Sequence, residues 1–507
     1  MPNEPIELLV TNTVTYIRGK LDKGIYQLFK KHLGYKTDDA IFRIKSMDNN
    51  SWASKWDGTI STVCFNKTWC RCAVKRDGTH FPTGLLSLAR EFFDSHGIVY
   101  KRIDKRNTVV KNIQLEMSSD FEQRDYQLDI VNKAVAQQRG IIKLATGGGK
   151  TSTAANLIKE LSVSPFIFYV PSIDLLQQSH DELSRFLKIS GSNLEVGMIG
   201  NMKCDIKDIN IMTVQTAIRS LGEKWKKYDE EESSEKKVSE LDENSKKLVK
   251  DLIMSSKGMI CDEVQHWASE TCQIISDYSV DAKYRYGMSA TPFRDKGDDI
   301  LIDSCFGKVI ADINASFLID RGYLVPPTIY FVKVDNMRGT AFPTYESAYK
   351  GSIVENSLRN SYIANIANGM QSQGKVILIL CRHIAHGKML NDMIEGSVFL
   401  HGEWTSKKRK EHLDKMRNRE ASITIASTIF DEGIDCRPLD TLILAGSGIS
   451  QTRALQRVGR TLRPYEGKSD AIVVDFEDNC KYMLKHSRKR KKIYQTEPRF
   501  SIKYLDI

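Results

Sequence analysis

Short apolar runs that alternate with helical patterns constrain this 507-residue chain more than any other feature. Strands buried on both faces have this pattern, because helices cover both sides of a parallel sheet. The runs form two groups separated by residues 320–327, which predicts two tandem α/β domains. The first group is Ile141–Leu144, Pro165–Val170, Ile209–Val214, Gly258–Cys261 and Tyr286–Met288, and the second is Lys375–Leu380, Ser397–Leu400, Ser422–Ala426, Leu439–Leu444 and Ala471–Phe476.

The residues before the first group predict a small α+β domain over 1–113. Helical spacing of apolar residues occurs over 25–33 and 85–96, and strand-like alternation occurs over 59–74. Residues 101–112 are polar, and we expect them to form a linker to the first α/β domain.

The two α/β domains are predicted at 114–325 and 326–478. Within the first domain, residues 223–250 are mostly Lys, Glu, Asp and Ser, which predicts a solvated insertion. Residues 479–507 are predicted to be a basic tail, because they include the run Lys-His-Ser-Arg-Lys-Arg-Lys-Lys. Such a tail could bind phosphates or only increase solubility.

The charge balance favours a polyanionic partner such as a nucleic acid. The chain has 74 Lys and Arg against 64 Asp and Glu, a formal net charge of +10, although many soluble proteins carry a similar excess. The ten cysteines are scattered and include no Cys-x-x-Cys pair, which favours free thiols in a reducing cytoplasm over a zinc site. Residues 1–7 are polar and no apolar run has the length of a membrane helix, so we expect no membrane partner.

A glycine-rich segment follows the first apolar run and precedes a helical pattern. This order is typical of loops that bind nucleoside triphosphates, because glycines let backbone N–H groups face the phosphates. Lys150 would reach the β- and γ-phosphates, and the Thr151 hydroxyl would bind Mg²⁺. The strict P-loop pattern would place glycine where Leu144 stands. The predicted nucleotide-binding residues of this segment are Ala145, Thr146, Gly147, Gly148, Gly149, Lys150 and Thr151.

Two adjacent acids end a later apolar run. Asp262 and Glu263 follow Gly258–Cys261, at the edge where parallel sheets bind ligands. We expect Asp262 to bind Mg²⁺ and Glu263 to orient and deprotonate the attacking water.

Arginines recur every third position in the second domain, at Arg457, Arg460 and Arg463. On a helix they would lie along one face, and Arg460 and Arg463 could contact the γ-phosphate across a domain cleft. A solvated basic helix is the alternative. With Gln456, these two arginines complete the predicted catalytic set of Lys150, Asp262, Glu263, Gln456, Arg460 and Arg463.

In this order along two α/β domains, these segments resemble a superfamily 2 helicase. The form Ala-Thr-Gly-x-Gly-Lys-Thr of the phosphate loop is typical of that group. The resemblance implies two tandem RecA-like domains, with ATP and Mg²⁺ as cofactors. It also implies adenine contacts from Phe121, Arg124 and Gln127, and nucleotide contacts from Gly433 and Asp435 in the second domain.

Further segments match the same group. Val170–Ser172 with Leu175–Gln178, and Thr213–Thr216, resemble motifs that contact the nucleic-acid strand. Ser289–Thr291 resembles the motif that couples the two domains. In that group a His or Asp two residues after the Asp-Glu pair usually bridges to this motif. In this chain Gln265 or His266 could form the bridge, and the sequence register favours Gln265.

The N-terminal residues narrow the resemblance to UvsW-type phage helicases. Lys55–Gly58 before a strand, and Phe81–Leu85 at the start of a helix, are similar to the small domain of that group. The resemblance implies that residues 1–113 bind DNA. It also implies a helicase that unwinds or branch-migrates forked and junction DNA in replication, recombination or repair. We expect it to act as a monomer in the host cytoplasm. A duplex-DNA translocase, an RNA helicase and a non-catalytic nucleic-acid binder remain the alternatives.

Overall fold

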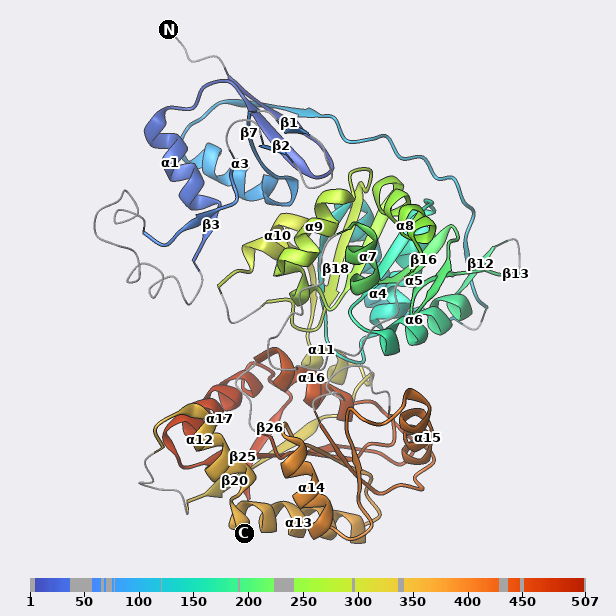
Figure 1. Cartoon of the computed structure of the whole chain (residues 1–507), viewed down its shortest axis with the longest axis vertical. Coiled ribbons are helices and arrows are strands. Elements are labelled where there is room, and N and C mark those ends of the chain that lie inside the picture. Colours follow the sequence, from blue (N-terminus) through green and yellow to red (C-terminus); the bar gives the residue numbers. More distant parts are fainter. Residues whose placement is uncertain are drawn as a thin grey trace. The chain divides into compact units, whose positions relative to one another are not determined.

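The computed structural model of the chain describes residues 5–36, 57–64, 68–69, 75–76, 78–119, 121–189, 192–222, 241–293, 297–335, 342–427, 436–446 and 451–505. It forms two compact units (Figure 1). The first unit is Met1–Lys143 with Gly149–Asp312, and the second is Leu144–Gly148 with Ile313–Ile507.

The first unit begins with an α+β module, as the sequence predicts. A four-stranded sheet in the order β7-β2-β1-β8 is covered by helices α1 and α3 (Figure 1). Phe29 of α1 packs against Phe81, Phe92 and Phe93, with ring centroids 5.0 to 5.7 Å apart. The elements are β1 (Ile6–Val10), β2 (Val14–Arg18), α1 (Lys23–His32), β3 (Gly34–Tyr35), β4 (Ile60–Ser61), β5 (Thr68–Trp69), β6 (Lys75–Arg76), β7 (Thr79–Pro82), α3 (Leu86–Ser95) and β8 (Tyr100–Asp104).

Close backbone contacts fasten this module to the rest of the first unit. A Cβ atom on Gly84 would lie 2.1 Å from the carbonyl oxygen of Asp303, so only glycine fits there. The Arg139 guanidinium donates to the carbonyl oxygen of Asn12 at 2.7 Å, and the Asn12 amide donates to that of Val280 at 3.1 Å. The prediction of a linker over 101–112 is wrong for residues 101–104. These residues belong to β8, which pairs in parallel with β1.

The remainder of the first unit contains an eight-stranded sheet in the order β15-β14-β16-β11-β17-β18-β10-β19 and a three-stranded sheet in the order β13-β12-β9. The central pairs of the eight-stranded sheet are parallel, which confirms the α/β prediction. The elements are β9 (Glu116–Met117), α4 (Asp125–Gln137), β10 (Arg139–Leu144), α5 (Lys150–Leu161), β11 (Phe166–Val170), α6 (Ile173–Phe186), β12 (Leu187–Ile189), β13 (Ser192–Asn193), β14 (Gly197–Gly200), β15 (Lys203–Asp205), β16 (Ile209–Thr213), α7 (Val214–Ser220), α8 (Glu243–Ser255), β17 (Gly258–Asp262), η3 (Val264–Ala268), α9 (Glu270–Tyr278), β18 (Tyr284–Ser289), α10 (Ile300–Phe306) and β19 (Val309–Ile313).

The expected insertion over 223–250 differs from the structure in its last third. Residues 243–250 are part of α8, and Val249, Leu252 and Ile253 of this helix pack into the core. Three buried positions on one face are enough to dock a helix that also carries several Lys, Glu and Asp residues. Residues 223–240 lie outside the described residues.

The second unit contains a seven-stranded sheet in the order β22-β23-β21-β24-β25-β20-β26, and its pairs are parallel. The elements are α11 (Ala315–Asp320), β20 (Pro327–Val334), α12 (Tyr345–Tyr349), η4 (Lys350–Val354), α13 (Ser357–Ser372), β21 (Ile377–Leu380), α14 (Ile384–Met393), β22 (Val398–Leu400), α15 (Ser406–Arg417), β23 (Ile423–Ala426), β24 (Thr441–Leu444), α16 (Gln451–Thr461), β25 (Ala471–Asp478), α17 (Lys481–Tyr494) and β26 (Ser501–Leu505).

The basic tail expected over 479–507 is instead part of the second unit. Its residues form α17 and the edge strand β26, which pairs with β20. Arg490 of α17 is buried and donates two hydrogen bonds to Asp475 of β25, at 2.7 and 2.8 Å. The Tyr494 hydroxyl donates to the same carboxylate at 3.1 Å. This segment therefore has a structural role, and only part of its charge faces solvent.

Two further observations concern the described part of the chain. No helix in it is long and apolar enough to cross a membrane. It also contains no group of three or more His, Cys, Asp and Glu side chains arranged to hold a metal ion. Lys55 and Trp56 of the N-terminal resemblance lie outside the described residues, whereas Phe81–Leu85 form the end of β7 and the turn before α3.

Candidate nucleotide-binding site

The glycine-rich segment turns the chain from β10 into α5. Gly147 and Gly149 have φ angles of +84° and +80°, which residues with a side chain rarely adopt. At Gly149 space is limiting as well, because a Cβ atom would lie 2.6 Å from both Gln127 Nε2 and Ser152 Oγ. At Gly148 a Cβ atom would lie 2.6 Å from the Leu144 side chain. The loop therefore needs these glycines for its own geometry.

Gln127 ties this loop to the start of α4. Its carbonyl oxygen accepts from the Arg124 backbone N–H at 3.2 Å, and its amide donates to Ser152 Oγ at 3.0 Å. The side chain is buried, so these bonds are protected from water. The adenine contact of Gln127 stays a prediction, whereas the structure shows a link between two elements. The sequence patterns do not identify Ser152, although a hydroxyl residue in the first helical turn after Lys150 is a candidate for such a contact.

Phe121 and Arg124 lie just before α4. Phe121 is half-buried and packs edge-on against Phe186, with ring centroids 5.4 Å apart. The Arg124 guanidinium donates to the Tyr126 hydroxyl at 2.9 Å. Their predicted adenine contacts also stay predictions.

Lys150 lies against both predicted acids. Its Nζ is 2.7 Å from Glu263 Oε1 and 3.3 Å from Asp262 Oδ1. These residues meet because β17 and β10 both pair in parallel with β18, so their carboxyl ends lie at one edge of the sheet. Glu263 has a φ angle of +48°, a strained conformation for a residue with a side chain. This strained residue lies at the junction between β17 and η3.

The three charges shift one another's proton affinities. Burial alone would lower the pKa of Lys150, but Asp262 and Glu263 outweigh it and raise that pKa. Burial would raise the pKa of Glu263, yet Lys150 and the Gln265 amide lower it to about 2. For Asp262 burial dominates over the attraction of Lys150, and its pKa is raised. Lys150 is therefore cationic and Glu263 is anionic at neutral pH.

Gln265 connects Glu263 to β18. Its amide donates to Glu263 Oε2 at 2.8 Å, and its carbonyl oxygen accepts from Ser289 Oγ at 2.7 Å. Gln265 thus links Glu263 to Ser289, which confirms the prediction that Gln265 rather than His266 bridges the two motifs. Gly287 permits it, because a Cβ atom there would lie 2.2 Å from the Val264 side chain and would push η3 away from β18.

The predicted residues of the second domain lie in the second unit. Gln456 and Arg460 are on α16 and Arg463 follows its end, and all three are half-buried. Ala454, Val458 and Leu462 are buried, so one face of this segment faces the core. Gly433 and Asp435 lie outside the described residues.

Two family models match the chain in its α/β regions. Residues 120–294 match the model described as type III restriction enzyme, res subunit. Residues 359–465 match the model described as helicase conserved C-terminal domain. The first match lies within the predicted α/β domain 114–325, and the second lies within the predicted α/β domain 326–478.

Two curated proteins are similar over most of the chain. The ATP-dependent DNA helicase uvsW of Enterobacteria phage T4 is 23% identical, over 94% of this chain and 92% of that protein. The DNA 3'-5' translocase XPB2 of Sulfurisphaera tokodaii is 24% identical, over 77% of this chain and 90% of that protein.

A solved structure supports the fold. The ATP-dependent Type ISP restriction-modification enzyme LlaBIII, bound to DNA, superimposes with a TM-score of 0.51 at 17% identity, over 83% of this chain and 36% of that one. The two parallel-sheet units are thus tandem RecA-like domains. The two family models match in order along the chain, and with the similarity to the T4 uvsW protein they support an ATP-hydrolysing superfamily 2 helicase that resembles the UvsW type.

Proposed function

We propose that this chain uses ATP hydrolysis to move along DNA and to unwind or branch-migrate forked and junction DNA. The contact of Lys150 with Asp262 and Glu263 carries the motor part of the proposal. The similarity to the T4 uvsW helicase supports the DNA part. Because it covers 94% of the chain, it extends into the N-terminal module that neither family model reaches.

The residues of the first unit fit a magnesium-bound nucleoside triphosphate. Backbone without side chains at Gly147–Gly149 would let N–H groups face the phosphates. Thr151 and Asp262 supply the hydroxyl and carboxylate oxygens that Mg²⁺ prefers. The bound ion would spread the charge that develops on the transferring phosphoryl group.

Lys150 and Glu263 would exchange partners during turnover. Lys150 is paired with Glu263 at 2.7 Å in this structure, and we propose that it moves to the β- and γ-phosphates. The freed Glu263 carboxylate then orients a water molecule and accepts its proton. Gln265 keeps that carboxylate pointed toward β18 through its bond to Ser289.

The remaining predicted residues complete the proposal. Arg460 and Arg463 contact the γ-phosphate and stabilise charge in the transition state, with Gln456 beside them on α16. Phe121 and Arg124 contact the adenine. Gly433 and Asp435 are proposed nucleotide contacts from the sequence alone. We propose a monomer as the working form.

Strand displacement on a panel of DNA structures tests the DNA part. Forked duplexes, four-way junctions, blunt duplexes and RNA duplexes are compared for ATP-dependent strand separation and for stimulation of phosphate release. We expect forks and junctions to be the best substrates. Equal stimulation by blunt duplex without strand separation would instead identify a duplex translocase; the XPB2 relative is named a DNA 3'-5' translocase. Activity confined to RNA would contradict the proposal.

A further inference from the structure

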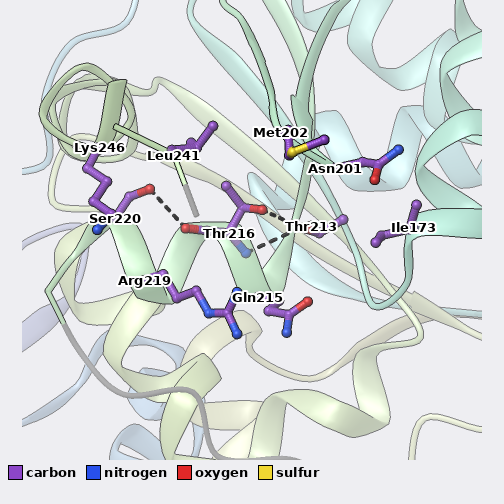
Figure 2. A pocket seen from close by; sticks show the side chains of 10 residues that line it. All are labelled: Ile173, Asn201, Met202, Thr213, Gln215, Thr216, Arg219, Ser220, Leu241 and Lys246. Carbon is purple, nitrogen blue, oxygen red and sulfur yellow. Dashed lines mark hydrogen bonds between the residues drawn. The ribbon is translucent and has the colours of Figure 1, made fainter. Parts of the chain in front are cut away.

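A pocket opens on the first unit between the β14–β15 hairpin, helix α7 and the start of α8 (Figure 2). It is a depression that is open to solvent, and its cavity volume is about 30 Å³. Thr213, Gln215 and Thr216 form one wall and belong to a segment that resembles a strand-contact motif. The hairpin and α8 belong to none of the recognised motifs, so the pocket extends that motif with residues of its own.

The pocket has a cationic lining. Of the ten described residues that line it, Arg219 and Lys246 are basic and none is acidic. Arg219 is half-buried, and within the described part of the chain its guanidinium has neither an ion pair nor a hydrogen-bond partner. Lys246 forms an ion pair with Glu243 at 2.9 Å, but the Glu243 side chain is 87% exposed and such pairs exchange readily. A half-buried guanidinium in this setting suits an anionic ligand.

The hairpin at the pocket edge has two residues in the left-handed region of backbone conformation. Asn201 and Met202 form its two-residue turn, because Gly200 pairs with Lys203, and their φ angles are +49° and +65°. Such turns favour Asn followed by Gly, whereas a methionine in the left-handed region is unfavourable. The Met202 side chain is also 67% exposed, so core packing does not explain its presence. In Figure 2 Asn201 and Met202 lie at the top of the view, and Arg219 and Gln215 lie at the bottom.

The turn is held rigidly against the sheet. A Cβ atom on Gly200 would lie 3.0 Å from Leu176 and 3.1 Å from Thr213, so the hairpin packs closely on the end of β16. Thr213 also fixes the start of α7, since its hydroxyl accepts from the Thr216 backbone N–H at 3.2 Å. Met202 and Arg219 are therefore presented from supports that are firmly packed.

We propose that this pocket binds one nucleotide of the strand along which the motor moves. Arg219, assisted by Lys246, contacts a backbone phosphate, and Met202 packs against the adjacent base. An apolar, flexible side chain can pack against any base, so the contact tolerates all sequences, as translocation requires. The inference rests on the proposed function, which supplies the nucleic acid, and adds a contact outside the family motifs.

Met202→Gly tests the base contact without harming the fold. The substitution creates Asn-Gly, the pair that this turn prefers, so thermal stability should be unchanged or higher. Affinity for a fluorescein-labelled oligothymidylate, measured by anisotropy, should fall by about fivefold, at the low end of values for lost base stacking. The dependence of affinity on salt should not change, because no charge is lost.

Arg219→Gln tests the phosphate contact through a different readout. The slope of log affinity against log salt concentration should become shallower by about 0.7, the value for one phosphate contact on a single strand. Lys247→Gln and Leu248→Ala are matched controls, because both residues are exposed on α8 and lie outside the pocket lining. Both control variants should bind as the wild-type chain does.

The outcomes separate this inference from the proposed function. If the wild-type chain binds the strand but Met202→Gly and Arg219→Gln bind identically to it, the pocket assignment is overturned and the motor proposal stands. If Lys247→Gln flattens the salt slope as much as Arg219→Gln, the effect is general charge and the assignment is also overturned. If the wild-type chain binds no nucleic acid, the proposed function fails and this inference fails with it.

Discussion

Lys150 is the residue on which the proposed chemistry of the first unit depends. It is the only cation that the described site places against both Asp262 and Glu263, at 3.3 and 2.7 Å. The two acids differ in environment, since burial dominates at Asp262 and the cation dominates at Glu263. Gln265 holds the Glu263 carboxylate in place, and Ser289 holds Gln265.

Ser289→Ala should separate the positioning of Glu263 from nucleotide binding. The change removes the hydroxyl that donates to Gln265 at 2.7 Å and accepts from the Thr291 N–H at 3.0 Å. Losing about 1 kcal/mol for each of these two bonds in the transition state predicts roughly a thirtyfold fall in turnover. Phosphate release gives the turnover, and titration with a fluorescent nucleotide analogue should show nearly unchanged affinity. Ser256→Ala, a buried serine bonded to Ile253, is the control. Wild-type turnover in Ser289→Ala would exclude the bridge from catalysis.

At the scale of elements, several strands buried on both faces were predicted, whereas the interior strands β14 and β20 and the edge strands β8 and β26 were missed. The apolar runs located β10, β11, β16, β17 and β18 because both faces of these strands are buried. In contrast, β8 and β26 are exposed edge strands with few buried side chains, so their residues resembled a linker and a tail. Helix α17 was hidden because Arg490 occupies its buried face and made the segment look wholly basic.

Arg490→Ala should destabilise the second unit strongly. The substitution leaves the buried Asp475 carboxylate without its cation, which costs about 3–5 kcal/mol for pairs of this kind. Urea unfolding followed by circular dichroism measures the loss. Arg488→Ala is the matched control, because Arg488 lies exposed on the same helix and should cost no more than about 0.5 kcal/mol. Equal stability of both variants would contradict the structural role of this segment.

Asp303→Asn should stabilise the first unit in a pH-dependent way. Burial and the nearby charge of Asp299 raise the pKa of Asp303 to about 6. The folded state thus binds a proton more tightly than the unfolded state, whose carboxyl has a pKa of about 4. Above about pH 6 the ionised carboxylate therefore destabilises the fold, and the penalty disappears as the pH falls to about 4.

The asparagine variant has no such penalty at any pH. We expect it to exceed the wild-type chain by about 1–2 kcal/mol at neutral pH, after allowance for partial exposure, and to lose that advantage toward about pH 4. Thermal unfolding at several pH values measures both. A difference that is independent of pH would show that the carboxyl of Asp303 does not titrate as described. The result matters for the N-terminal module, because the Asp303 backbone lies against Gly84 of that module.

At the scale of the whole molecule, the order of the motifs predicted more than their individual residues did. A glycine-rich loop, an acid pair and an arginine repeat define a motor only together, and the two family models match the same regions in the same order. The sequence could not show that the described residues of the N-terminal module pack on the rest of the first unit. That packing depends on Asn12, Gly84 and Arg139, which come together only in the fold and have no local pattern.

The measurement that tests the central claim most directly is phosphate release by Lys150→Ala with and without single-stranded DNA. The wild-type chain should hydrolyse ATP and be stimulated by the strand, whereas the variant should lose at least about 100-fold in turnover while still binding DNA. Lys159→Ala, on the same helix and paired only with its exposed neighbour Glu160 among the described residues, should behave as the wild-type chain does. Wild-type turnover in a folded Lys150→Ala variant would contradict the account of this chain as an ATP-driven motor.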